Sequence, residues 1–318
     1  MMPNFKHLIA AMLLLNVFSC DRPLENIVSN CDDFKFVDEN LLEYPEKLFS
    51  APCFNPENSN EFIYVEYEPY EEVYNKKLWK FNLLTKEKTF IADNVWCNPK
   101  YGLHEWIFFN RFNEQIWKVK SNGDSLQPLF TQELNYDVEA CVSDERIVFR
   151  RIIESDYFAM FSDYDGNILY KIVDNVYSDG SWSSDGNKLL STYSFTNTAR
   201  GIAVYNTLYN LLYKFNHGEY ESNDDAIHGM DWYVDSENFV WCKRDGVYRV
   251  NINSGLQELL IEGCSASEYG YPSFSPNNST ILLEHYSLKH LEGNAYFKES
   301  NIVITDINGM NEVLINLE

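Results

Sequence analysis

The sequence predicts an all-β chain built from six copies of one four-stranded antiparallel unit. Two distant stretches read alike, SWSSDGNKLLSTY at 181–193 and SFSPNNSTILLEHY at 273–286: each has an aromatic residue, a polar turn and a short apolar strand. Aromatic residues make up 16% of the chain, and such side chains favour strands. Long helix-forming windows are missing, because most segments alternate or carry β-branched and aromatic residues.

One anchor residue per copy marks the repeat, and it stands just before the first turn. Successive anchors are 41 to 50 residues apart, a spacing typical of repeat architectures and long enough for four short strands. The anchors are Phe54, Cys97, Cys141, Trp182, Trp232 and Phe274. Glycine-containing pairs then predict reversals between strands. These pairs are Asn122-Gly123, Asp165-Gly166, Asp185-Gly186, Ser254-Gly255 and Asn308-Gly309.

Six such units predict a six-bladed β-propeller. A single four-stranded sheet would expose an apolar face, and packing blades radially buries these faces while leaving only short edges. The S-x-D-G element at 183–186 and the F-S-P-N element at 274–277 resemble the repeats of TolB-like and WD40-like six-bladed propellers. The resemblance covers about residues 50–318 and implies protein–protein interaction in the cell envelope.

The first 49 residues lie outside the repeats. Residues 1–19 carry Lys6 followed by an apolar run, which is typical of an export signal and too short to span a membrane. The stretch VFSC resembles the lipobox of bacterial lipoproteins, which implies lipidation of Cys20. Residues 20–49 are then a lipidated segment and linker, with no part in closing the ring. Because DRPLEN after the cysteine lacks an acidic run, we expect a periplasm-facing protein.

Charge and motifs exclude several function classes. The net charge is −23, so the basic footprint of a nucleic-acid binder is missing. The sequence also lacks a G-x-S-x-G nucleophile elbow, a glycine-rich phosphate loop and a regular calcium loop. Six cysteines follow Cys20, a number that allows disulfides in an exported chain or buried free thiols.

In a blade whose strands follow one another as a meander, each loop lies on one of the two faces of the ring. The turn after the anchor and the turn before the last strand share the first face. The loop between the second and third strands and the connector to the next blade share the second face. The second-face loops are long, acidic and rich in tyrosine, and function concentrates on such loops. The predicted ligand-binding residues at the channel mouth are Asp137, Glu139, His228, Asp231, Tyr269 and Tyr271.

Histidines suggest a second kind of site. Four of them fall on the second face near blades five and six: His217, His228, His285 and His290. With Glu284 and Asp231 they are candidates for a divalent metal site, although no H-E-x-x-H spacing supports it. No cofactor is otherwise expected.

The leading interpretation is a non-enzymatic, monomeric propeller that binds or scaffolds an envelope protein or a carbohydrate. The alternative is a metal-dependent, lyase-like enzyme acting on carbohydrate, with its site at the channel mouth near blades five and six. Some TolB-like propellers are lyases with a histidine-bound metal, so this alternative rests on the resemblance and on the histidines.

Overall fold

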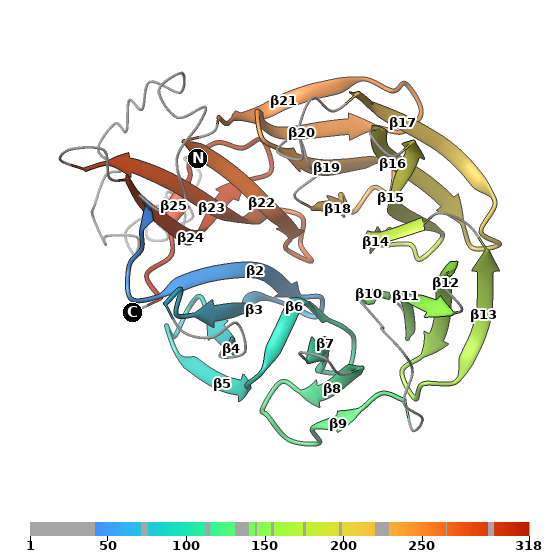
Figure 1. Cartoon of the computed structure of the whole chain (residues 1–318), viewed down its shortest axis with the longest axis horizontal. Coiled ribbons are helices and arrows are strands. Elements are labelled where there is room, and N and C mark those ends of the chain that lie inside the picture. Colours follow the sequence, from blue (N-terminus) through green and yellow to red (C-terminus); the bar gives the residue numbers. More distant parts are fainter. Residues whose placement is uncertain are drawn as a thin grey trace, which may run out of the picture.

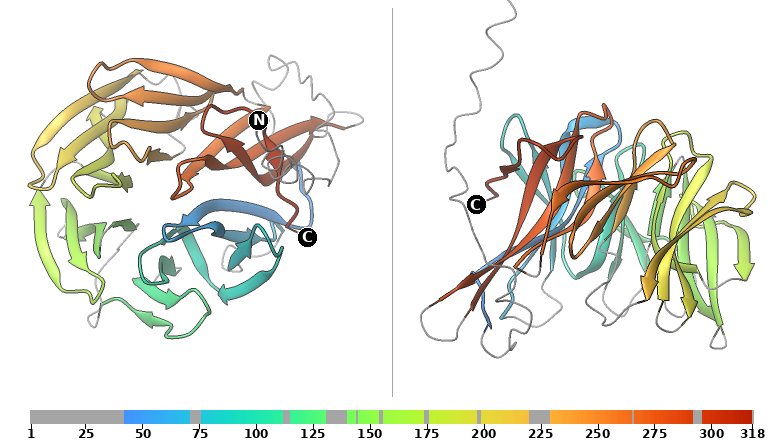
Figure 2. Two further views of the ribbon diagram at one scale, coloured as in Figure 1. Left: turned by 180° about the vertical axis from the view of Figure 1, so that it is seen from behind. Right: turned by 90° about the horizontal axis from the view of Figure 1, so that it is seen from above.

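The computed structural model shows a closed ring of six blades around a central channel (Figure 1). It describes residues 42–70, 76–111, 115–130, 140–143, 145–153, 156–173, 176–196, 199–219, 229–264, 266–291 and 296–317. Every regular element in these ranges is a strand, so none of them provides a helix that could cross a membrane. The strands run between the two faces of the ring, as the side view in Figure 2 shows.

Each blade is a four-stranded antiparallel meander with its first strand innermost. Blade one contains β2 (Leu48–Asn55), β3 (Asn58–Tyr67), β4 (Lys77–Asn82) and β5 (Lys88–Ala92). Blade two contains β6 (Val95–Tyr101), β7 (Trp106–Arg111), β8 (Ile116–Lys120) and β9 (Gln127–Pro128). Blade three contains β10 (Ala140–Ser143), β11 (Arg146–Ile153), β12 (Asp156–Asp163) and β13 (Ile168–Val173).

The other three blades repeat this order. Blade four contains β14 (Val176–Trp182), β15 (Lys188–Thr196), β16 (Ala199–Asn206) and β17 (Leu211–Glu219). Blade five contains β18 (Met230–Trp232), β19 (Asn238–Lys243), β20 (Gly246–Asn251) and β21 (Gln257–Glu262). Blade six contains β22 (Ser267–Phe274), β23 (Thr280–His290), β24 (Tyr296–Asp306) and β25 (Val313–Leu314). The predicted six-bladed, all-β architecture is confirmed.

The last blade supplies its own four strands. A further short strand, β1 (Leu42–Glu43), pairs in parallel with the outer edge of β24, where Leu42 faces Tyr296. The strand β25 uses the same edge further along, with Leu314 facing Val303. The short strand β1 therefore lies at the outer edge of blade six, and side-chain packing joins the first blade to the last.

The hydrophobic core lies in the seams between blades. Each pair of neighbouring blades shares one cluster of buried side chains, including the pair formed by the first and last blades. In that closing seam Phe62 and Tyr64 of blade one pack with Leu282 and Ile302 of blade six. Every blade thus buries both faces, which is the physical reason for closing the ring.

Strand register corrects two anchors. Phe54, Trp182 and Phe274 pair with Phe62, Leu189 and Ile281, each of which packs in the seam with the preceding blade. In blade two the equivalent residue is Tyr101, which pairs with Ile107, whereas Cys97 pairs with Asn110 further back. The prediction of Cys97 as an anchor was therefore wrong. In blade three Val142 pairs with Ile147, which packs with blade two, whereas Cys141 pairs with Val148, so the prediction of Cys141 was wrong as well. The WCNP stretch looks like the start of a turn but belongs to an irregular strand.

Four innermost strands contain a bulge next to the channel. The register shifts between Ser50 and Cys53 in β2 and between Gly270 and Ser273 in β22, with similar shifts in β6 and β14. Proline lies within three of these bulges, where no ladder hydrogen bond is required of it. A bulge redirects the following side chains, here those that point into the channel.

Candidate functional site

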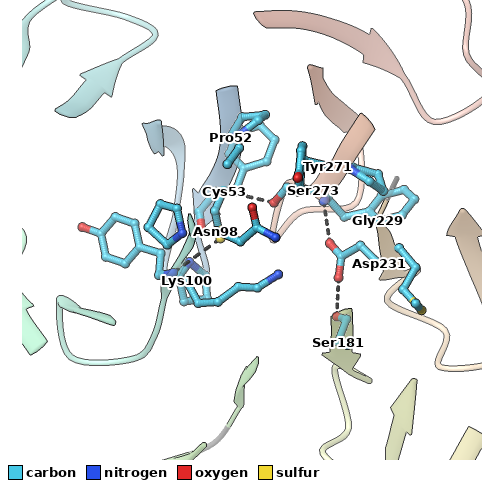
Figure 3. A pocket seen from close by; sticks show the side chains of 18 of the residues that line it. Pro52, Cys53, Asn98, Lys100, Ser181, Gly229, Asp231, Tyr271 and Ser273 are labelled. Atoms are coloured by element: carbon cyan, nitrogen blue, oxygen red, sulfur yellow. Dashed lines mark hydrogen bonds between the residues drawn. The ribbon is translucent and has the colours of Figure 1, made fainter. Parts of the chain in front are cut away.

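A cavity of about 170 Å³ occupies the central channel (Figure 3). Innermost strands and adjoining residues of five blades form its wall, so it lies on the axis of the ring rather than inside one blade. Its lining includes Ala51, Pro52, Cys53, Phe54, Pro56, Asn98, Pro99, Lys100, Tyr101, Gly180, Ser181, Trp182, Gly229, Met230, Asp231, Tyr271, Pro272, Ser273 and Phe274.

The residue just before each anchor provides most of the polar groups of this cavity. We call these positions the pre-anchor ring. Its members in the cavity lining are Cys53, Lys100, Ser181, Asp231 and Ser273. They come from different blades and meet at the axis only because the blades are arranged radially.

Three members of the pre-anchor ring link one blade to the next. The anchor N–H of Phe54 donates to Ser273 Oγ of blade six at 3.0 Å. The anchor N–H of Tyr101 donates to Cys53 Sγ of blade one at 3.4 Å. In the same way the N–H of Phe274 donates to Asp231 Oδ2 of blade five at 2.9 Å. A repeated acceptor at this position therefore satisfies a backbone donor of the following blade.

Asp231 connects three blades. Besides the N–H of Phe274 in blade six, its carboxylate accepts a hydrogen bond from the hydroxyl of Ser181 in blade four. Burial raises the pKa of the Asp231 carboxyl, while the hydrogen bonds from Ser181 and Phe274 oppose this shift. Both carboxylate oxygens are therefore held by the protein.

Lys100 breaks the pattern of the pre-anchor ring. An ammonium group has three donors and no acceptor, so it cannot receive an anchor N–H of the next blade. In Figure 3 its side chain extends into the cavity toward the wall that carries Asp231. Burial raises the pKa of the Cys53 thiol, and the nearby Lys100 ammonium opposes that increase. The cavity thus contains the ammonium of Lys100, the carboxylate of Asp231 with its hydrogen bonds to the protein, and the thiol of Cys53, whose raised pKa favours the protonated form.

Only some of the predicted channel residues line the cavity. Asp231 and Tyr271 line the cavity. Tyr269 does not: it is buried, stacks on the His285 ring with centroids 4.6 Å apart, and donates to Glu312 at 2.9 Å. Asp137, Glu139 and His228 lie outside the described residues.

Sequence reasoning missed Cys53, Lys100, Ser181 and Ser273. The predicted site residues lie on or beside the second-face loops, whereas the cavity wall is made mainly of the innermost strands. A usable signal was present, since polar residues recur directly before the anchor in several copies. With Cys97 as the anchor of blade two, the residue before the anchor is Trp96, so Lys100 is not recognised as a pre-anchor residue.

No metal centre is visible in the part of the chain that the structure describes. Those residues contain no group of three or more histidine, cysteine, aspartate and glutamate side chains able to hold an ion. His285 instead hydrogen-bonds through Nε2 with Ser267 Oγ at 2.8 Å and lies 3.6 Å from Glu312. The side chains of His217 and His290 are outside the description, as is all of His228.

The cysteines fall into different environments. Cys53 and Cys242 are free thiols, and Cys242 is fully buried. Cys264 is disulfide-bonded. The proposed lipidation site, Cys20, lies outside the described residues.

Comparisons with known proteins find likeness in structure rather than in sequence. No family model and no curated protein matches the chain. A putative TolB from Agrobacterium tumefaciens superposes with a TM-score of 0.56 at 12% identity, over 74% of this chain and 86% of the other. Regucalcin, a calcium-binding protein from Agrobacterium tumefaciens, gives a TM-score of 0.53 at 10% identity, over 80% and 90%. A structure of a nidogen/laminin complex gives a TM-score of 0.50 at 14% identity, over 67% and 79%. Identities this low show the fold alone, and that fold is a TolB-like six-bladed β-propeller.

Proposed function

We propose that this chain is a lipoprotein of the bacterial cell envelope whose propeller binds a protein partner. The observation that carries this proposal is an apolar strip along the outer edge of blades four to six, here called the apolar rim. It consists of Leu208, Leu211, Leu212, Leu256, Leu259, Met310, Val313 and Leu314, whose exposed fractions range from 41% to 77%.

The apolar rim crosses blade boundaries. The Tyr213 hydroxyl of blade four lies within 3.5 Å of Asn253 Oδ1 in the turn of blade five. The turn at Gly309 in blade six packs against Leu260 and Ile261 of blade five so closely that an added Cβ would overlap them. The exposed side chains of the three blades therefore lie on contacting elements, and a contiguous exposed apolar patch is a feature of interaction sites.

The chemistry of the rim favours a protein over a carbohydrate. Aliphatic side chains fill the buried centre of protein interfaces, where charged residues are depleted. The rim also includes β17 and β21, each the last strand of its sheet, so each has one edge free of a neighbouring strand in the described part of the sheet. The nidogen/laminin structure provides a precedent for a fold of this kind in a complex with another protein.

Two features support the envelope assignment. The first is the export signal followed by the VFSC stretch, which predicts acylation of Cys20 and anchoring to a membrane surface. The second is the disulfide of Cys264, because such bonds persist in exported proteins and are rare in the cytosol. We assign the protein to the periplasm-facing side, since DRPLEN carries no acidic run.

Crosslinking in the intact envelope followed by affinity capture of the tagged chain tests the proposal. We expect one stoichiometric protein partner, lost from a Leu208→Glu, Leu256→Glu double variant. Leu84→Glu is the matched control, because Leu84 is 71% exposed in the corresponding turn of blade one, outside the rim. Equal capture by both variants, or capture of no partner by the unaltered chain, would reject the rim as the binding surface.

Metabolic labelling with palmitate tests the anchor separately. The unaltered chain should carry the label and sediment with membranes, whereas Cys20→Ser should lose both properties. A labelled Cys20→Ser chain would contradict lipidation at this residue while leaving the partner experiment intact.

A further inference from the structure

We propose that Cys264 is bonded to Cys31, and that this disulfide shortens the tether between the propeller and the membrane. The pairing follows from the positions of the described cysteines and of β1. The choice of Cys31 over Cys20, and with it the shortened tether, also rests on the proposed lipidation of Cys20. Neither part involves the apolar rim.

The described cysteines leave few partners for Cys264. Its sulfur is in a disulfide bond, whereas Cys53 and Cys242 are free thiols. The chain has seven cysteines, so four others could complete the bond.

Two of these four lie in the wrong blades. Cys97 is part of β6 in blade two, and Cys141 is part of β10 in blade three. Cys264 lies in the connector between blades five and six, so at least one whole blade stands between it and either strand (Figure 1). A disulfide requires Cα atoms within about 7 Å of each other. Cys20 and Cys31 therefore remain, and acylation of Cys20 would occupy its sulfur.

The strand β1 brings the N-terminal side of the chain to the same end of blade six as Cys264. Leu42 of β1 pairs with Tyr296, which in turn faces His290 near the end of β23. The carbonyl of Ala266, two residues after Cys264, accepts an N–H from the same end of β23 at 2.9 Å. Both segments thus lie at the second-face end of this sheet.

Cys31 is close enough in sequence to reach Cys264. It stands 11 positions before Leu42, and an extended chain covers about 3.3–3.6 Å per residue, or roughly 36–40 Å in all. From β1 across β24 and β23 to β22 there are three strand spacings, or about 15 Å. The available chain therefore exceeds the distance to be covered.

The disulfide would limit how far the ring can lie from the membrane. Cys31 comes 11 positions after Cys20, which allows a reach of roughly 36–40 Å. Without the bond, the chain is first held at Leu42, 22 positions after Cys20, with a reach of roughly 73–79 Å. The bond therefore halves the reach and keeps the second-face end of blade six toward the membrane.

Peptide mapping of the full chain, purified without reduction, tests the pairing. Digestion after glutamate cuts at Glu25, between Cys20 and Cys31, and isolates Cys264 in the peptide 263–268. We expect mass spectrometry to find this peptide linked to the one that contains Cys31, and to find it released by a phosphine reductant. A link to any other cysteine, or an alkylated Cys264 before reduction, would overturn the pairing.

The same map distinguishes a failure of the pairing from a failure of the proposed anchor. A link between Cys264 and Cys20 would reject both the pairing and the lipidation. A link to Cys31 in a chain whose Cys20 carries no lipid would uphold the pairing and reject the shortened tether.

Energy transfer in vesicles tests the reach. The acylated full chain is placed in phosphatidylethanolamine vesicles that contain a dansyl lipid, and transfer from the native tryptophans is measured. We expect Cys31→Ser and Cys264→Ser to lose transfer to the same extent, and the double variant to lose no more, because both substitutions break one bond. Cys53→Ser, which removes a free thiol, is the matched control and should keep full transfer. Unchanged transfer in both single variants would overturn the shortened tether.

Discussion

The carboxylate of Glu284 in blade six accepts a hydrogen bond at 2.9 Å from the backbone N–H of Ala51 in blade one, 233 residues away in sequence. Ala51 lies in the β2 bulge with a positive φ of 50°, so its N–H points out of the strand ladder. Glu284 is completely buried and supplies the acceptor that the bulge requires. This contact joins the first and last blades of the ring, and it gives the carboxyl an unusual titration.

We predict that Glu284 makes stability fall as pH rises from about 4.5 to about 7. Burial raises the pKa of Glu284 from 4.5 to about 7, so the unfolded chain loses this proton at lower pH than the folded one. The hydroxyl of Ser300 also has only one proton, and the Phe49 carbonyl at 2.7 Å requires it. Ser300 Oγ and Glu284 Oε1 lie 2.9 Å apart, and a proton on the Glu284 carboxyl group then provides the donor for the hydrogen bond between them.

Urea unfolding of Glu284→Gln at several pH values measures this effect. The amide keeps an acceptor for Ala51 and cannot ionise, so the variant should gain about 1–3 kcal/mol relative to the unaltered chain between pH 4.5 and 7. Glu284→Ala should destabilise at all pH values, because it leaves the Ala51 N–H without its acceptor. A constant difference between Glu284→Gln and the unaltered chain across this range would contradict the prediction.

His285 should have the opposite pH dependence. Burial lowers the pKa of His285 to about 4, so the folded chain keeps the ring neutral while the unfolded chain protonates it near 6.5. Its contribution is complete above pH 6.5 and is lost as the pH falls toward 4. Glu312 faces the ring from the other side, and burial raises the pKa of that carboxyl as well.

Comparing the stability of His285→Gln with that of the unaltered chain isolates the contribution of His285 protonation to the pH dependence. The variant can still hydrogen-bond Ser267, and we expect its stability relative to the unaltered chain to rise by about 1–3 kcal/mol as the pH falls from 6.5 to 4. Metal analysis of both proteins tests the competing role for this histidine. Stoichiometric zinc that disappears with His285→Gln would support a metal site instead.

Removing the Asp231 side chain should destabilise the ring by about 2–4 kcal/mol. Asp231→Ala deprives the Ser181 hydroxyl and the Phe274 N–H of their acceptor, and both lie in the channel wall. The exposed Asp165, which contacts Lys118 at 3.4 Å, provides a control whose replacement should cost less than about 1 kcal/mol. Equal effects of the two substitutions on the unfolding midpoint would show that Asp231 does not link the blades.

Two glycines in corresponding turns allow the effect of backbone strain on stability to be distinguished from the effect of packing between blades. Gly255 and Gly309 have positive φ angles of 70° and 73°, so alanine strains both turns by about 1 kcal/mol. A Cβ on Gly255 meets open space, whereas a Cβ on Gly309 would lie 2.8 Å from the carbonyl oxygen of Leu260. Gly309→Ala should therefore lower the melting temperature more than Gly255→Ala. A similar decrease in both variants would argue against tight packing of blade six on blade five.

Local signals in the sequence predict the repeat, and six repeats predict a ring of blades. Aromatic anchors such as Trp182 and turn pairs such as Asp185-Gly186 are local signals, because strand and turn preferences depend on neighbouring residues. These signals were enough for six blades of four strands. They failed at Cys97, because a bulge changes register and no local pattern distinguishes the shifted residue from the true anchor.

The contacts between residues of different blades follow from the radial arrangement of the blades. Lys100 and Asp231 are far apart in sequence, and they share a cavity because the ring brings every pre-anchor position to one axis. The same geometry separates Tyr269 from Tyr271, two residues away, since side chains on a strand point to alternating sides and a bulge interrupts the alternation. The pairing of Glu284 with Ala51 depends on closure of the whole ring, which brings together two residues that are 233 positions apart in sequence.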